Sequence, residues 1–154
     1  MKRIRFLNKL ELSELWPVID EVISSGGEFR LTPYGTSMLP LIKPGEDAVS
    51  LVLPNEIKKT DIVLYKRLDG SFVLHRVMYI DKNEYVMCGD NQNYLERGIK
   101  REQILAVVKN IYKNDNSVNT EDKAYKKYIK SLYRKTRKSR IRLILSRIKH
   151  KIFK

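Results

Sequence analysis

A serine and a histidine are the side chains of this sequence whose types and spacing best suit catalysis. Ser37 lies in the segment YGTSMLP, between Gly35, which allows a tight turn, and Pro40, which fixes the exit of the chain. A serine hydroxyl is a weak nucleophile unless a base takes its proton, and His75, in the segment FVLHRV, is the candidate base. Taken singly, each residue is more typical of a structural role. As a pair they could transfer an acyl group from a peptide carbonyl while backbone N–H groups bind the oxyanion.

The elements that must position this pair are predicted as one helix followed by short strands. Residues 13–25 have helical spacing, with Ser13 as N-cap, Pro17 in the first turn and Gly26 and Gly27 after the end. Later runs predict five or six strands, at 28–31, 48–53, 61–65, 72–78, 85–88 and 104–108. We expect a mainly β fold: a small antiparallel, half-open β-barrel with an N-terminal helix and a basic helical C-terminal tail.

Charge separates a neutral body from a basic tail. The chain has 154 residues, 42% of them hydrophobic, which is typical of a globular domain and excludes disorder throughout. Its net charge of +13 resides in residues 122–154, which hold 14 of the 31 lysines and arginines and one of the 18 acids. We predict an N-terminal helical segment (1–27), a β catalytic domain (28–112), a polar linker (113–121) and a basic amphipathic tail (122–154).

Cysteine, histidine and hydropathy patterns limit the compartment and the cofactors. Cys88 is the only cysteine, so no intrachain disulfide can form, and we expect it to serve packing in a reducing compartment. No stretch approaches the roughly 18 apolar residues of a membrane span. The two histidines lie far apart in the sequence, so we expect no metal and no cofactor. We predict a cytoplasmic protein, peripheral at the inner face of the membrane if its tail binds there.

Three segments together resemble the signal peptidase family of serine peptidases. They are GTSMLP (35–40), DIVLY (61–65) followed by VLHRV (73–77), and GDNQ (89–92), in the family's order and at similar spacing. The related repressor-type self-cleaving peptidases share the Gly-x-Ser-Met signature but use a lysine base. The segment LHRV makes the chain more similar to the archaeal, sporulation and endoplasmic-reticulum branch, which uses a Ser/His pair.

The resemblance implies a role for each of four residues. The family's nucleophile falls on Ser37, its general base on His75, and its conserved acid on Asp90, which would orient the imidazole or stabilise its cation. A second acid falls on Glu96, where the family usually has aspartate. In Gly-Asp-Asn, Asp90 is also typical of a residue that only forms a turn. For Glu96, a functional role and a purely structural role both stay open.

The oxyanion site departs from the family pattern. Gly35 stands where signal peptidases usually carry a hydroxyl, so the oxyanion would rely on the Ser37 N–H and the Thr36 hydroxyl. The resemblance still implies a serine endopeptidase that trims a peptide or protein precursor. The missing hydroxyl favours the alternative, a non-catalytic binding or regulatory module of the same fold. Activity should fall at acid pH, with a midpoint near the ordinary histidine value of about 6.5 if the surroundings do little.

The basic tail over 122–154 has three interpretations. Two amphipathic segments carry apolar residues on one helical face each: Tyr125, Tyr128, Ile129, Leu132 and Tyr133, then Ile141, Ile144, Leu145, Ile148 and Ile152. Such helices fit an anionic membrane surface best. Binding to nucleic-acid phosphates, and a solvated extension or a helix packed on the body, stay open.

Overall fold

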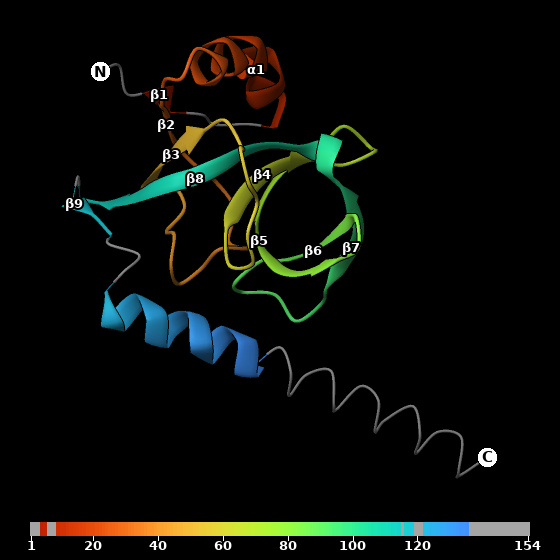
Figure 1. The fold of residues 1–154 in the computed structure, drawn as a ribbon. Helices are drawn as coiled ribbons and strands as arrows, with labels where there is room; N and C mark the ends of the chain where they lie inside the picture. The colour runs from red at the N-terminus through yellow and green to blue at the C-terminus, as the bar shows by residue number, and fades with distance from the viewer. Residues whose placement is uncertain (1–3, 6–8, 115, 119–121, 136–154) are drawn as a thin grey trace. The chain divides into compact units, whose positions relative to one another are not determined.

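The computed structural model describes residues 4–5, 9–114, 116–118 and 122–135 (Figure 1). The chain divides into two compact units, Met1–Val118 and Asn119–Lys154. The first unit contains the helix α1 and the sheet. The second contains a helix over 123–135, as the sequence predicts for its first amphipathic segment. The segment 141–152, expected to be a second amphipathic helix, lies outside the described residues.

Helix α1 (Lys9–Ser24) starts earlier than its capping pattern predicts. The predicted start at Ser13 is wrong, and Pro17 lies inside the helix instead of in its first turn. A proline there removes one helical hydrogen bond, because it has no N–H. Ile19 and Ile23 are fully buried, and tertiary packing of such an apolar face is what stabilises most helices in proteins.

The sheet has nine strands, and it is antiparallel except for one edge pair. The strands are β1 (Ile4–Arg5), β2 (Phe29–Thr32), β3 (Ala48–Val52), β4 (Ile62–Lys66), β5 (Phe72–Asp81), β6 (Glu84–Cys88), β7 (Glu96–Lys100), β8 (Ile104–Lys113) and β9 (Asn116–Ser117). Their order is β1-β2-β3-β8-β4-β5-β6-β7, with β9 paired to β8 and β1 parallel to β2. The described strands do not close into a ring, so the fold is mainly β with an open sheet.

The core lies inside the curled half of this sheet, where β4, β5, β6 and β7 wrap around in Figure 1. Strand β8 joins the two halves, because Val107 is the register partner of both Val52 in β3 and Val63 in β4. One hydrophobic cluster fills the curl: Ile57, Val63, Tyr65, Val77, Met87, Ile99 and Ile104. The alternation of β5 therefore sends Val77 into the core and, two residues earlier, His75 toward the same side.

The sequence missed three strands, and the 3-10 turn Arg101–Gln103 that follows β7 was not predicted either. Strand β7 reads Glu-Arg-Gly-Ile-Lys and has one buried residue, Ile99, so it lacks the apolar alternation of a strand. Strands β1 and β9 have two residues each. The polar segment 113–121, expected to be a linker, contains the end of β8 and all of β9. Within the described part of the chain, no helix has the length and hydropathy needed to cross a bilayer.

Candidate active site

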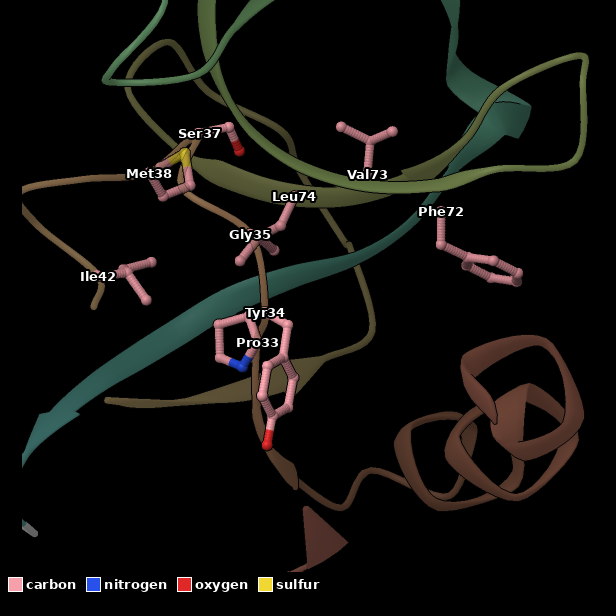
Figure 2. Close-up of a pocket in the computed structure, with 9 residues that line it drawn as sticks. All are labelled: Pro33, Tyr34, Gly35, Ser37, Met38, Ile42, Phe72, Val73 and Leu74. Carbon is pink, nitrogen blue, oxygen red and sulfur yellow. The ribbon is translucent and has the colours of Figure 1, made fainter. Parts of the chain in front are cut away.

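Ser37 lies on the loop between β2 and β3, at the wall of a small pocket. Gly35 has a φ of +99°, a conformation that L residues with a side chain rarely adopt, so glycine is required for this turn. The pocket measures about 130 Å³ (Figure 2). Its walls are mostly apolar: Pro33, Tyr34, Gly35, Ser37, Met38 and Ile42 from the loop, and Phe72, Val73 and Leu74 from β5. The half-buried serine therefore faces a space that a ligand side chain could enter.

The loop after β6 holds the backbone of Ser37. The Asn91 N–H donates to the Ser37 carbonyl at 2.8 Å, and the Asn91 side chain donates to the Thr36 carbonyl at 3.2 Å. A Cβ atom on Gly89 would lie 2.7 Å from that Ser37 carbonyl, closer than real Cβ contacts. The Gly-Asp-Asn motif is therefore needed to let two segments of backbone approach closely.

The residue after His75 binds the acid of the same motif. Arg76 donates from Nε to Asp90 Oδ1 at 2.8 Å and from Nη2 to Asp90 Oδ2 at 2.7 Å. Its Nη1 donates to the Thr60 carbonyl at 2.7 Å. Both ionic side chains are buried, with 0% and 1% of their surfaces exposed, so the two charges depend on each other for solvation.

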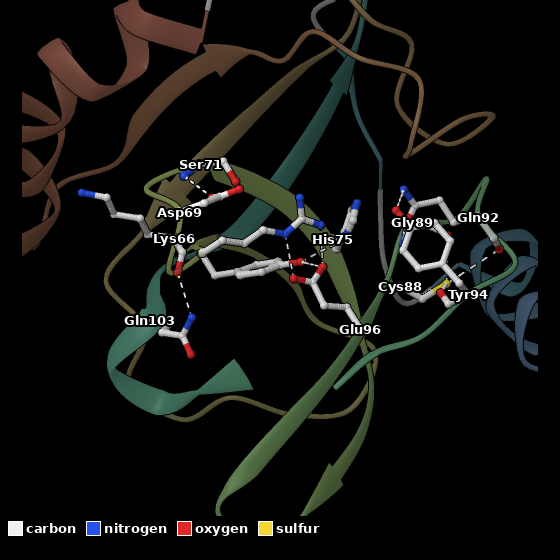
Figure 3. Close-up of polar contacts among 12 residues, drawn as sticks. Lys66, Asp69, Ser71, His75, Cys88, Gly89, Gln92, Tyr94, Glu96 and Gln103 are labelled. Carbon is white, nitrogen blue, oxygen red and sulfur yellow. Dashed lines mark hydrogen bonds and ion pairs between the residues drawn. The ribbon is translucent and has the colours of Figure 1, made fainter. Parts of the chain in front are cut away.

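His75 lies inside the sheet next to a chain of polar side chains (Figure 3). The Tyr65 hydroxyl is 3.2 Å from His75 Nδ1 and donates to Glu96 Oε2 at 2.7 Å. Arg67 binds the same carboxylate with two hydrogen bonds, 2.7 Å from Nε and 2.6 Å from Nη2. Glu96 therefore reaches the imidazole through Tyr65, from a strand that the sequence did not predict.

Burial sets the protonation of this group of side chains. Desolvation lowers the pKa of His75 to about 4, although the nearby Glu96 charge raises it. The hydrogen bonds from Arg67 hold the pKa of Glu96 below its ordinary value. At neutral pH the pair is therefore a neutral imidazole and an ionised carboxylate, and the imidazole has one nitrogen free to accept a proton.

The structure places some of the predicted site residues near one another, but their observed hydrogen bonds are not all made to the partners that the sequence predicts. Ser37 lies beside β5, but among the described residues no hydrogen bond joins its hydroxyl to His75. Asp90 is the bidentate partner of Arg76, so its observed hydrogen bonds support the loop next to Ser37. Thr36 is exposed, and its carbonyl accepts hydrogen bonds from the Leu39 N–H and from Asn91.

Sequence reasoning missed Tyr65, Arg67 and Arg76 as members of the site. A signal for Tyr65 was present, because the turn at 68–71 predicts a hairpin between its two flanking strands. In the observed register Tyr65 lies opposite Val73, which places it diagonal to His75 on the same face. No such signal exists for Arg67 and Arg76, because their partners come from distant segments.

The described residues offer no group of three or more His, Cys, Asp or Glu side chains that could hold a metal ion. No protein-family model matches the chain, and no curated protein matches it either. The functional interpretation therefore rests on the arrangement of these side chains.

Proposed function

We propose that this chain is a serine endopeptidase of the signal-peptidase type, which cleaves a peptide or protein precursor with Ser37 as nucleophile and His75 as base. The single observation that carries the proposal is the meeting of the three motif segments. Asn91 binds the Ser37 carbonyl, and Asp90 binds the arginine that follows His75. The nucleophile, the base and the acid-bearing loop thus form one connected arrangement, built from residues distant in the sequence.

The chemistry would be acyl transfer. His75 takes the proton of the Ser37 hydroxyl as the oxygen attacks a peptide carbonyl, and then gives it to the leaving amine. The oxyanion is held by backbone N–H groups, with the N–H of Ser37 and the hydroxyl of Thr36 as candidate donors. Water then attacks the acyl group, again with His75 as base. Among the described residues no hydrogen bond joins Ser37 to His75, and catalytic hydrogen bonds often form only around bound substrate.

The strand edge beside Ser37 supports an extended substrate. Phe72, Val73 and Leu74 pair with β4 on one side, whereas pairing of β5 with β6 begins at Arg76. Backbone groups of the first half of β5 can therefore pair with a peptide laid across the pocket. The space of about 130 Å³ suits one small or medium apolar side chain of that peptide.

Cleavage of a library of extended peptides, read by mass spectrometry, tests the proposal. The wild type should cut, and both Ser37→Ala and His75→Gln should lose activity by a factor of about 10³ or more. Ser25→Ala is the matched control, because this exposed serine directly follows α1 and donates to the Val22 carbonyl. Cleavage that survives Ser37→Ala, or a folded wild type that cuts no peptide, would contradict the proposal.

A binding module of the same fold is the second candidate, and Gly35, in place of the hydroxyl that signal peptidases usually carry, favours it. Trp16 is the only tryptophan and lies against Phe72 of the pocket wall, with ring centroids 5.8 Å apart. Peptides that bind at the pocket should therefore change its fluorescence. A fluorescence change without cleavage in the wild type would favour the binding module over the peptidase.

Binding of the basic tail to an anionic membrane surface stays a prediction of the sequence. Sedimentation with anionic and with neutral vesicles, in parallel with a nucleic-acid shift assay, distinguishes the two partner classes. Binding to anionic vesicles alone would support the membrane, and weakening of that binding by salt is expected.

A further inference from the structure

Tyr65 connects the proposed base to a carboxylate that does not touch it. We infer that Tyr65 is a positioning residue that fixes His75 in one tautomer, with the proton on Nδ1 and the lone pair on Nε2. The inference rests on the proposed function for its catalytic meaning, although the tautomer itself can be measured without any substrate. It assigns a role to Tyr65, which shares no observed hydrogen bond with Ser37 or Asp90.

The Tyr65 hydroxyl has a single proton for its two polar contacts. A phenol has one proton to donate and lone pairs to accept. Here the hydroxyl oxygen has two close partners, Glu96 Oε2 at 2.7 Å and His75 Nδ1 at 3.2 Å. The single proton can serve one of them, so the other contact must be made by a proton from the partner.

The charge on Glu96 decides which partner receives the proton of the Tyr65 hydroxyl. Arg67 donates two hydrogen bonds to Glu96, and these lower the pKa of that carboxylate. An ionised carboxylate can only accept, and charge-assisted hydrogen bonds are the shorter and stronger kind. The 2.7 Å contact is therefore the one that the Tyr65 proton makes. The hydroxyl oxygen then faces His75 Nδ1 with a lone pair, so Nδ1 must carry a proton.

Burial restricts the movement of Tyr65 and His75. Tyr65 is fully buried and packs in the hydrophobic cluster, and His75 has 2% of its surface exposed. Tyr65 lies diagonal to His75 on the same face of the β4–β5 pair, and the centroids of the two rings are 6.0 Å apart. The hydroxyl therefore has little freedom to turn away, and the imidazole is held with Nε2 as its acceptor before substrate arrives.

The position of Tyr65 between Glu96 and His75 affects the protonation of the imidazole. A carboxylate in direct contact with an imidazole favours the cation strongly, whereas here burial dominates and His75 stays neutral. During the reaction the imidazole gains a proton, and the Glu96 charge then stabilises the cation through the hydroxyl. The same arrangement thus keeps the base free in the resting protein and supports it in the charged intermediate.

Nitrogen NMR of the full chain labelled in histidine tests the tautomer. A His150→Gln background leaves one imidazole, because the sequence has two histidines. At pH 7 the wild-type His75 should show one protonated nitrogen, Nδ1, and one unprotonated nitrogen, Nε2. In Tyr65→Phe both nitrogens should move toward averaged shifts, as the two tautomers exchange. A proton on Nε2 in the wild type, or unchanged shifts in Tyr65→Phe, would overturn the inference.

Activity measurements add a second readout. Tyr65→Phe should lower kcat about ten-fold or more with little change in KM, because the base is less often in the correct tautomer. Tyr79→Phe is the matched control and should keep both values, because Tyr79 is the register partner of Val86 farther along β5 and does not line the pocket beside Ser37. If Tyr65→Phe reduces the near-UV circular dichroism of the fold, Glu96→Gln replaces it, since that side chain is 20% exposed and the substitution removes the charge and one of the two acceptor oxygens. Glu96→Gln should then move the nitrogen shifts in the same direction.

The two proposals fail in different ways. Unchanged kcat in Tyr65→Phe, in an enzyme that needs Ser37, would overturn the positioning role and leave the peptidase intact. A wild type that cuts no peptide would contradict the peptidase, while the nitrogen shifts would still decide whether Tyr65 fixes the tautomer.

Discussion

Arg76 and Asp90 form two parallel hydrogen bonds, of 2.8 and 2.7 Å, with both side chains buried. The pair ties the middle of β5 to the loop after β6, which in turn holds the Ser37 carbonyl. The sequence assigned Asp90 to the imidazole of His75. Its observed hydrogen bonds to Arg76 support the loop that holds the backbone of Ser37, and its charge raises the pKa of His75, so a role toward the imidazole stays a prediction.

Replacing Asp90 with asparagine should destabilise the protein strongly. The variant leaves the Arg76 charge buried without its counter-charge, and breaking such a pair costs about 3–5 kcal/mol. Urea unfolding measures the change in the free energy of unfolding. The matched control is Glu56→Gln, which removes the exposed ion pair with Lys58 and should cost less than about 1 kcal/mol. Equal losses of stability in the two variants would show that the buried pair stabilises the protein no more than the exposed pair does.

The pH profile of cleavage should extend further into acid than an ordinary histidine allows. Burial lowers the pKa of His75 to about 4, so the base stays neutral at pH 5. The midpoint near 6.5, expected for an imidazole little affected by its surroundings, is replaced by one near this lower pKa. Initial rates across acid pH measure it. A midpoint near 6.5 would mean that His75 is solvated in the working enzyme.

Stability should fall as the pH falls from about 6.5 toward 4. In this window the unfolded chain protonates His75 and the folded chain does not, because its folded pKa is depressed. The loss from this group is roughly 3 kcal/mol by pH 4. Urea unfolding midpoints measured at several pH values give the slope of stability against pH. His75→Gln should flatten it and His150→Gln should not, so equal slopes in all three proteins would contradict the assignment.

Gly89→Ala should lower activity beyond its effect on stability. The new Cβ would meet the Ser37 carbonyl at 2.7 Å, so the backbone of Ser37 must move, and small displacements in an active site cost about 10²-fold in rate. Gly27→Ala provides the control, because its Cβ would meet the Val22 carbonyl at 2.8 Å within the region of α1. Rates and urea unfolding are compared for both. Full activity in a folded Gly89→Ala protein would contradict the close approach.

Leu74→Ala should change which peptides are accepted. Leu74 lines the pocket from β5, so shortening it enlarges the space beside Ser37. We expect kcat/KM for peptides with a larger apolar residue to rise about ten-fold relative to those with a small one. Leu68→Ala is the control, because Leu68 is 97% exposed in the β4–β5 turn and does not line the pocket. A ratio unchanged by Leu74→Ala would place the substrate elsewhere.

Local patterns predicted most of the fold. Strands near 28–31, 48–53, 61–65, 72–78, 85–88 and 104–108 are all present, because alternation and turn residues are properties of neighbouring positions. Strand β7 escaped prediction because its pairing with β6, and not its own composition, makes it a strand. The start of α1 was misplaced because Pro17, which is best tolerated in the first turn of a helix, lies inside α1.

The sequence by itself determined the residue types of the candidate site, the neutral body and the basic tail. Only the tertiary structure decided the partners: Asp90 binds Arg76, 14 residues away, and Glu96 binds Tyr65, 31 residues away. It also decided the protonation of His75, because a pKa depends on how much water the fold removes. The sequence shows which chemistry each residue type can perform, whereas the partners and the solvation of a residue depend on segments that meet only on folding.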